Sequence, residues 1–228
     1  MTDREVGDTP LLRAAGLYKS YATPQGALSV LKGADLTLSA GESVALLGES
    51  GSGKSTLLHL IGGLDEADRG DILLDGVYVT DLSDAGRAEL RREKIGIVFQ
   101  QFNLVPSLTV GANLAFQARL ARRFDQAWHD ALVTRLGLAS LEARYPEQLS
   151  GGQQQRVAIG RALALKPRLV IADEPTGNLD EATGDEVLGL ALDLVRSTGC
   201  GFLMVTHSTR LAARLDRQVT LAAGVVVS

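Results

Sequence analysis

The stretch GESGSGKST, residues 48–56, decides the fold of this 228-residue chain. It matches G-x-x-x-x-G-K-[ST], a spacing in which glycines let backbone N–H groups curl round phosphate oxygens. An apolar run at 43–47 precedes it and predicts a buried strand. The run KSTLLHLI follows it and predicts a helix that stops at Gly62-Gly63. Such a helix directs its positive end at the same anion. The sequence therefore predicts a nucleotide phosphate site and not a glycine-rich turn with an exposed Lys54.

The composition bounds the class of protein. Hydrophobic residues make up 45% and charged residues 22% of the chain, as in globular proteins with a packed core. A formal net charge of −4 gives no basic field, so we expect no nucleic acid partner.

Runs such as LVIA and GFLMV are far shorter than the ~20 residues of a spanning helix. The first ten residues contain no apolar signal segment, and we expect no direct membrane insertion. Cys200, the single cysteine, fits a reducing compartment and a buried structural thiol.

The N-terminal half of the chain reads as strands. Residues 12–38 predict short strands, and residues 94–100 predict another. Residues 70–79 predict a hairpin that turns at Asp75-Gly76, because Asp-Gly is a strong hairpin signal.

Helical and strand patterns then alternate. Helical spacing runs from residue 110 to about 165, and apolar strands follow at 169–175 and 201–207 with a helix between them. This order indicates an α/β fold with a parallel-sheet core, whose ligands lie outside the carboxyl ends of the strands. We expect a single domain over 1–228, with the core and its β flank at 11–100 and 166–228 and a helical subdomain at 101–165.

Two carboxylates follow the strand LVIADE, residues 169–174. Asp173 is placed to hold Mg²⁺ through a water, and Glu174 to polarise an attacking water. Lys54 adds a point charge on the phosphates, and the Ser55 hydroxyl suits Mg²⁺. Solvated acids at a strand end are the alternative interpretation.

A second candidate anion site follows in LSGGQ, residues 149–153. A serine and paired glycines at a helix start resemble a phosphate cradle. One chain thus carries two such motifs, about a hundred residues apart.

Together these motifs resemble the nucleotide-binding subunits of ABC transporters, over residues 12–224 and in family order. The resemblance implies the P-loop NTPase fold of an ABC nucleotide-binding domain, with an N-terminal antiparallel β flank and a helical subdomain. It also implies ATP and Mg²⁺ as ligands and ATP hydrolysis as the activity. The implied catalytic residues are Glu174, His207, Lys54 and Gln100, and the implied metal ligands are Ser55, Gln100 and Asp173. The implied ATP-binding residues are Tyr21, Gly48, Glu49, Ser50, Gly51, Ser52, Gly53, Lys54, Ser55, Thr56, Gln100, Ser150, Gly151, Gly152, Gln153 and Asp180.

Several of these assignments have alternatives. Tyr21, the implied adenine-stacking residue, could be an ordinary edge-strand aromatic, and His207 could be a core histidine. Gln101 could replace Gln100 as the coordinating glutamine. His59 reads as a packing residue, and His129 with its neighbour Trp128 as a packing or surface pair.

The resemblance also implies partners. In this family the phosphate loop and LSGGQ of one chain face different nucleotides, which implies an ATP-sandwich homodimer. The strings at 98–114 and 173–180 are similar to the branch serving lipoprotein release, macrolide export and cell division. A separate transmembrane permease would then dock at residues 102–118, with this chain peripheral on the cytoplasmic face of the inner membrane. The transported substrate would be set by the permease.

Two other functions remain open, a nucleotide-dependent regulatory scaffold and a soluble non-transport ABC ATPase. The sequence also departs from the family pattern. Ser208 stands where Asp is common, and the ending LAAGVVVS at 221–228 lacks the usual acidic-glycine-basic pattern, so we expect no regulatory C-terminal domain. The basic segment at 81–96 is most simply a solvated helix face, with anionic lipid or the permease as the alternative partner.

Overall fold

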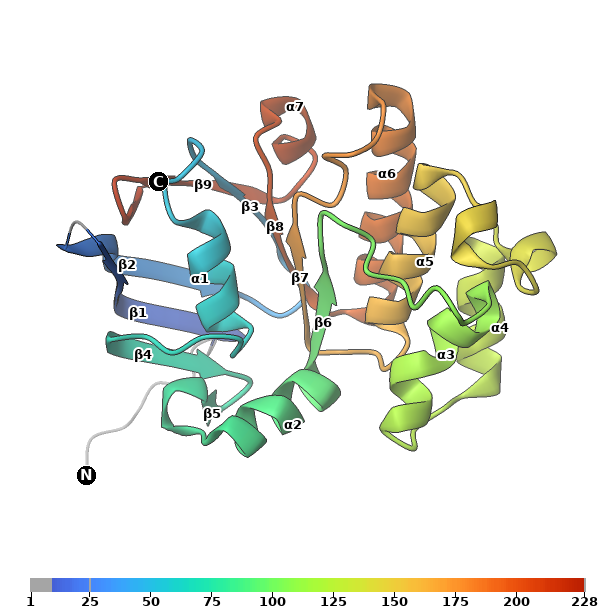
Figure 1. Ribbon diagram of the computed structural model, residues 1–228, viewed down its shortest axis with the longest axis horizontal. Coiled ribbons are helices and arrows are strands. Elements are labelled where there is room, and N and C mark those ends of the chain that lie inside the picture. The colour runs from blue at the N-terminus through green and yellow to red at the C-terminus, as the bar shows by residue number, and fades with distance from the viewer. Residues whose placement is uncertain (1–9, 25, 228) are drawn as a thin grey trace.

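The computed structural model describes residues 10–24 and 26–227. Two β-sheets lie side by side, and helices occupy the far side of the second sheet (Figure 1). The expectation about a signal segment falls mostly on residues 1–9, outside the described residues. No helix within the described ranges is long and apolar enough to cross a membrane.

The first sheet is antiparallel, with the strand order β2-β1-β4-β5. Its strands are β1 (Leu12–Thr23), β2 (Gly26–Leu38), β4 (Arg69–Leu74) and β5 (Val77–Tyr78). The expected short strands at 12–38 are in fact two long ones. The register between β1 and β2 shifts near Gly16, which has a φ of 57°. Such a bulge interrupts the period of two, so one bent strand reads as two short ones.

The hairpin at 70–79 is confirmed. Asp75 and Gly76 both have positive φ values, 48° and 79°, as a two-residue type I′ turn requires.

The second sheet has the strand order β10-β9-β3-β8-β7-β6. Its strands are β3 (Ser43–Leu47), β6 (Ile95–Val98), β7 (Leu169–Asp173), β8 (Gly201–Val205), β9 (Arg217–Ala222) and β10 (Val225–Val227). All pairs are parallel except β9 with β10. The predicted parallel core with an antiparallel N-terminal flank is therefore confirmed. β9 and β10 were not predicted.

The helices connect these strands. They are α1 (Lys54–Ile61), α2 (Asp84–Lys94), α3 (Val110–Leu120), α4 (Gln126–Arg135), α5 (Gly151–Leu163), α6 (Glu181–Thr198) and α7 (Thr209–Ala212). Short 3₁₀ turns occur at η1 (Val79–Asp81), η2 (Ala139–Leu141) and η3 (Pro146–Gln148). α1 ends at Gly62, as predicted.

Alternation along the parallel strands creates two hydrophobic cores. On β7, Leu169 and Ile171 face the core shared with α1 and the antiparallel sheet, whereas Val170 and Ala172 face the core shared with α5 and α6. A strand buried on both faces reads as a continuous apolar run. β7 is therefore packed on both faces, and it carries Asp173 at its carboxyl end.

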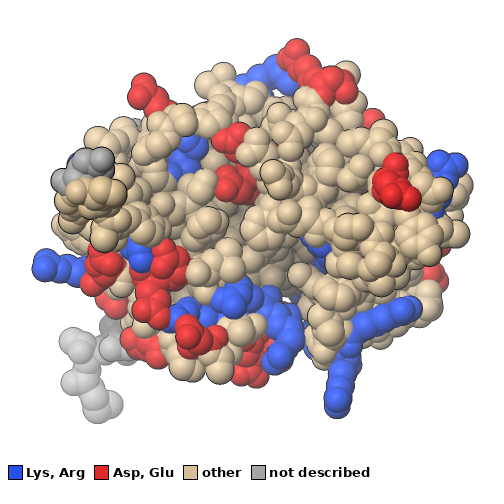
Figure 2. Space-filling model, in the orientation of Figure 1, with Lys and Arg blue, Asp and Glu red and all other residues tan. Residues whose placement is uncertain are grey.

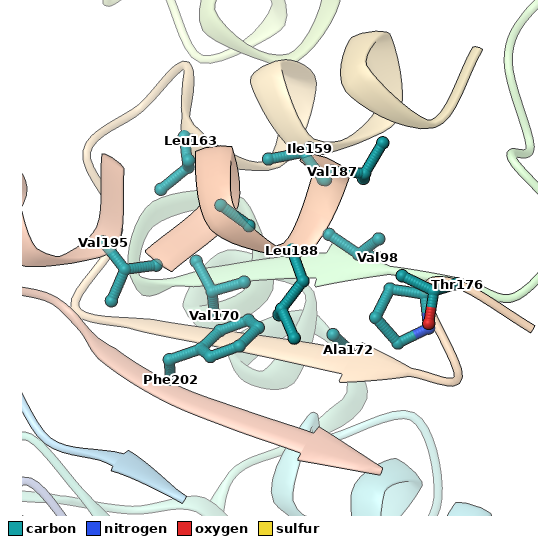
Figure 3. Close-up of a pocket in the computed structure, with 12 residues that line it drawn as sticks. Val98, Ile159, Leu163, Val170, Ala172, Thr176, Val187, Leu188, Val195 and Phe202 are labelled. Atoms are coloured by element: carbon teal, nitrogen blue, oxygen red, sulfur yellow. The ribbon is translucent and has the colours of Figure 1, made fainter. Parts of the chain in front are cut away.

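A small gap remains in the second core, between α5, α6 and strands β6 to β8 (Figure 3). Val98, Leu188 and Phe202 point into it, and its free space is about 10 Å³. That space holds about one water at most, and its lining is almost wholly apolar. It is a packing gap and not a nucleotide site.

The basic segment at 81–96 forms α2, but its interpretation as a solvated face is only partly right. Figure 2 shows Lys and Arg side chains gathered along the lower edge of the molecule, where α2 lies in Figure 1. Arg87 is buried and pairs with Glu66 and Asp84, and Arg91 donates to the Gly63 carbonyl. These side chains hold α2 against the loop after α1. A long arginine side chain can cover apolar surface with its methylene groups while its guanidinium forms hydrogen bonds.

Trp128 and His129, for which packing and surface exposure were both open, are partly buried. Trp128 Nε1 donates to the Leu163 carbonyl at 3.0 Å, and His129 Nε2 lies 3.1 Å from Glu142. Cys200 is buried and free, and burial raises the pKa of its thiol. His59 is half-buried on α1.

Candidate nucleotide-binding site

The phosphate loop leaves the carboxyl end of β3 and enters α1. Gly48 and Gly53 have φ values of 152° and 103°. A side chain at Gly48 would overlap the Leu221 carbonyl of β9, and one at Gly53 would lie 2.9 Å from Val30. Glycine is therefore required here by close packing as well as by conformation.

Lys54 lies folded over its own loop. Its Nζ donates to the carbonyls of Gly48 and Glu49, both at 2.8 Å, and the residue is only 5% exposed. Burial lowers the pKa of Lys54, while the nearby carboxylates of Glu174 and Asp173 act in the opposite direction. The structure thus brings the predicted lysine and both predicted carboxylates into one site.

The two carboxylates stand at the end of β7. Glu174 has a φ of 44° and its N–H donates to the Val205 carbonyl at 3.0 Å. A non-glycine residue in this region is strained, and such strain is found at functional sites. Glu174 Oε1 lies 2.6 Å from Nε2 of His207, which follows β8. The adjacent strands β7 and β8 therefore hold an acid and an imidazole in direct contact.

Gln100 reaches the same place from the end of β6. A side chain on Gly177 would lie 3.1 Å from Gln100 Nε2 and 3.4 Å from Glu174 Oε2. The Gln100 and Glu174 side chains thus converge on the space beside Gly177. Asn178 Nδ2 donates to the Gln100 carbonyl at 2.9 Å.

Two further hydrogen bonds hold the backbone that follows Gln100. Arg161 of α5 is 8% exposed and donates to the carbonyls of Asn103 at 2.6 Å and Phe102 at 3.1 Å. Burial lowers the pKa of this guanidinium. Sequence reasoning missed Arg161 and Asn178, because neither spacing nor residue type tells which backbone oxygen a side chain will reach.

The donor set for a cation fits Mg²⁺. A hydroxyl from Ser55, an amide oxygen from Gln100 and a carboxylate from Asp173 are the hard oxygen ligands that this ion prefers. Within the described ranges no group of three or more His, Cys, Asp or Glu residues is arranged to hold a metal. The Ser52 hydroxyl of the same loop is buried and has no hydrogen-bond partner in the protein.

LSGGQ begins α5, on the other side of strands β6 to β8 from α1 (Figure 1). Ser150 is the N-cap: its hydroxyl accepts from the Gln153 N–H at 3.3 Å, and the Gln153 side chain accepts from the Ser150 N–H at 3.0 Å. This is a capping box, a purely local stabilisation. A side chain at Gly152 would lie 2.5 Å from Thr183 of α6. Gly152 thus has a packing role that the sequence did not reveal.

Asp180 and Ser208 are both helix caps. Asp180 accepts from the Thr183 N–H at 3.0 Å at the start of α6, and hydrogen bonding from the Thr183 side chain and N–H lowers the pKa of its carboxyl. Ser208 accepts from the Leu211 N–H at 3.3 Å at the start of α7. Serine and aspartate both serve as N-caps, so the departure at Ser208 preserves the local hydrogen bond.

Tyr21 lies near the end of β1 with 38% of its surface exposed. Its hydroxyl donates to Asp65 Oδ2 at 2.8 Å and also interacts with the side chain of Thr56, at the start of α1. The aromatic ring therefore stands beside the helix that carries the phosphate loop.

Three comparisons place this geometry among known proteins. Residues 31–177 match the family model described as ABC transporter. The lipoprotein-releasing system ATP-binding protein LolD of Roseobacter denitrificans is 46% identical over 94% of this chain and 96% of that protein. An uncharacterised ABC transporter ATP-binding protein of Mycobacterium tuberculosis is 45% identical over 94% of this chain and 88% of that protein.

A solved structure agrees with these relatives. The dimeric, post-hydrolysis ATP-binding cassette MJ0796, bound to ADP and Pi, superposes with a TM-score of 0.85 at 36% identity. The match covers 95% of this chain and 97% of that one. With its phosphate loop, paired carboxylates and LSGGQ helix in this arrangement, the chain belongs to the ABC transporter family, as an ATP-binding subunit with the ABC ATPase fold.

Proposed function

We propose that this subunit hydrolyses ATP with Glu174 and His207 as its catalytic pair, and that it powers a separate permease of the lipoprotein-release or macrolide-export type. The observation that carries the proposal is the 2.6 Å contact between Glu174 and His207, beside Lys54 and the phosphate loop. Relatives named as lipoprotein-releasing ATP-binding proteins support the type of permease.

The proposed reaction is in-line attack of water on the γ-phosphorus. Lys54 exchanges its bonds to the Gly48 and Glu49 carbonyls for bonds to phosphate oxygens. Glu174 orients the water and accepts its proton, while the bond from the γ-phosphorus to the leaving oxygen breaks to release ADP. His207 is placed to exchange its contact with Glu174 for one with the γ-phosphate.

Mg²⁺ would be held by Ser55 and Gln100 directly and by Asp173 through a water. When bound, it neutralises charge on the phosphates. The convergence of Gln100 and Glu174 beside Gly177 favours Gln100 over Gln101 as the ligand.

We further propose that two copies of the chain complete each site. Ser150 to Gln153 begin a helix on the far side of the sheet from α1, so a second copy is the natural source of this motif at each γ-phosphate. In this proposal Asp180 lies at the contact between the copies. The dimeric state of the MJ0796 cassette supports it.

The same proposal divides the chain into a core at 11–100 and 166–228 and a helical subdomain at 101–165. Residues 102–118 would dock the permease, which would hold the subunit on the cytoplasmic face of the inner membrane. Changes in the dimer would then move the helical subdomain and so the permease.

The test of the catalytic assignment is Glu174→Gln. The amide cannot accept the proton from water, so we expect phosphate release to fall by about a thousandfold or more, while ATP-dependent dimerisation persists in light scattering. Glu89→Gln, an exposed carboxylate on α2, is the matched control. Undiminished hydrolysis by the Glu174 variant would refute the assignment.

The shared site has a separate test. A Lys54→Ala chain and a Ser150→Arg chain should each be inactive alone. Mixed together they form some dimers with one intact site, in which the second chain supplies Lys54 and the first supplies Ser150. Recovered hydrolysis supports the shared site, and no recovery despite dimerisation contradicts it.

A further inference from the structure

Tyr21 is bound by a cluster of side chains that the proposed reaction does not use. Asp65 follows α1 and accepts two hydrogen bonds from side chains, from the Tyr21 hydroxyl to Oδ2 and from Lys19 Nζ to Oδ1, both at 2.8 Å. Its Oδ1 also accepts from the Glu66 N–H at 2.7 Å. Lys19 also donates to the Glu66 carbonyl at 2.7 Å. Both oxygens of Asp65 are therefore engaged, one with the aromatic ring and one with the cation.

The two charges in this cluster are partly enclosed by the protein. The Lys19 side chain is only 11% exposed and that of Asp65 is 31% exposed. Burial acts against both charges, yet the hydrogen bond between them raises the pKa of Lys19 and lowers that of Asp65. A buried charge is stable only when it is paired and hydrogen-bonded, so the position of each group is tightly determined.

The same pair determines how the ring of Tyr21 stands. Lys19 Nζ lies over the ring, 5.1 Å from its centroid, an attractive cation–π distance. Asp68 also joins the loop after α1 to β1, because its carboxylate accepts from the Ser20 N–H at 2.7 Å and its own N–H donates to the Tyr18 carbonyl at 2.9 Å. The ring is thus held at its hydroxyl and on one face, and 38% of the residue stays exposed.

We propose that Asp65 is a positioning residue for nucleotide binding, which fixes the Tyr21 ring at the orientation in which the base stacks on it. The inference rests on the proposed adenine role of Tyr21. α1 carries the phosphate loop at one end and leads to Asp65 at the other, so one short helix places both the phosphate site and the base platform. Asp65 then contributes to base affinity and takes no part in phosphate chemistry.

The experiment is a double-mutant cycle on the KM for ATP, with the intact chain. Asp65→Ala and Tyr21→Phe each break the bond between the carboxylate and the hydroxyl, while Tyr21→Phe keeps the stacking ring. We expect each to raise KM about fivefold, a part of what base stacking contributes, with kcat within about twofold of the wild type. The double variant should show no further increase, because the same bond is already broken. Asp81→Ala, which removes an exposed carboxylate in the same half of the chain, is the control.

Other results would overturn the inference. Unchanged KM in either single variant, or multiplied effects in the double variant, would show that Asp65 does not act through the Tyr21 hydroxyl. Asp65→Leu keeps a side chain of similar length without an acceptor, and serves if the alanine variant does not fold. Tyr21→Ala separates the two proposals: an unchanged KM there removes the adenine role itself. An increased KM there, with Asp65→Ala at the wild-type value, removes only the positioning role.

Discussion

Replacing Arg161 by methionine tests how the chain after Gln100 is held. The substitution keeps an unbranched apolar stem and removes the guanidinium that bonds the Asn103 and Phe102 carbonyls. Because those residues follow Gln100 directly, the loss should act on both stability and turnover.

The magnitude follows from the two hydrogen bonds. A hydrogen bond to a charged group contributes about 1.5–3 kcal/mol, so two contribute about 3–6 kcal/mol. The cost of burying the charged guanidinium offsets part of this stabilisation, as the lowered pKa of Arg161 indicates. We expect a net loss of about 2 kcal/mol in the free energy of unfolding, or about 4–8 °C in Tm for a chain of this length.

The assay pairs urea unfolding with steady-state phosphate release at a temperature where every variant is folded. A freed Gln100 loop should lower kcat by about tenfold or more, since a small displacement of a positioned group is costly. Arg161→Lys keeps the charge on a single donor nitrogen that can reach only one of the two carbonyls, and should lose about half as much stability. Arg92→Met is the matched control, because that arginine is exposed and lies 4.0 Å from Glu89.

Two results would refute this reasoning. An unfolding midpoint equal to that of Arg92→Met would show that the two bonds contribute nothing net. A clear loss of stability with wild-type kcat would show that they stabilise α5 without positioning Gln100.

Three other predictions concern charge, packing and the metal. The hydrogen bond from Lys94 holds the pKa of Asp75 below its ordinary value of 3.8, with Arg168 3.1 Å away. Asp75→Asn keeps the turn and should cost about 1 kcal/mol. The difference in unfolding free energy between the variant and the wild type should be present above pH 3.8. It should be lost as the pH falls through the lower pKa of Asp75 in the folded protein. Unfolding measured at about pH 7 and at about pH 3 tests this. Gly96→Ala would place a methyl 2.5 Å from the Ala162 carbonyl, so we expect a loss of about 1–3 kcal/mol by chemical denaturation. Chelation of divalent metal should abolish phosphate release, and added Mg²⁺ should restore it. The Ser55→Ala variant should require more Mg²⁺ than the wild type for half-maximal release. Phosphate release that survives chelation would exclude the proposed metal.

Much of the fold could be predicted because its strongest signals are local. Apolar runs bounded by glycine or polar residues predicted β3, α1 and β7, and Asp75-Gly76 predicted the hairpin between β4 and β5. β9 and β10 were not predicted because exposed and half-buried residues interrupt both strands, so neither forms a continuous apolar run. Their turn at Ala223-Gly224 has two positive φ values, 51° and 87°, but Ala-Gly is a weaker turn signal than Asp-Gly.

The residues of the candidate site also divide into those that local sequence predicts and those that it does not. Residues whose roles depend on neighbours in sequence, such as Lys54 and the Asp173–Glu174 pair, could be named from spacing. Arg161 and Asp65 could not, because their partners lie 58 and 44 residues away in the chain. Only the folded topology brings those segments together.

The edges of the two sheets bear on how the subunit behaves when it is concentrated without its partners. An unpaired strand edge invites pairing with another chain, and so aggregation. Here β5 has only two residues, and β6 lies against α5 so closely that Gly96 faces the Ala162 carbonyl. The middle of β2 is covered where the Lys32 N–H donates to the Gly224 carbonyl at 2.9 Å, beside the turn into β10. The turn that the sequence did not reveal therefore helps to protect the longest strand from strand exchange between molecules.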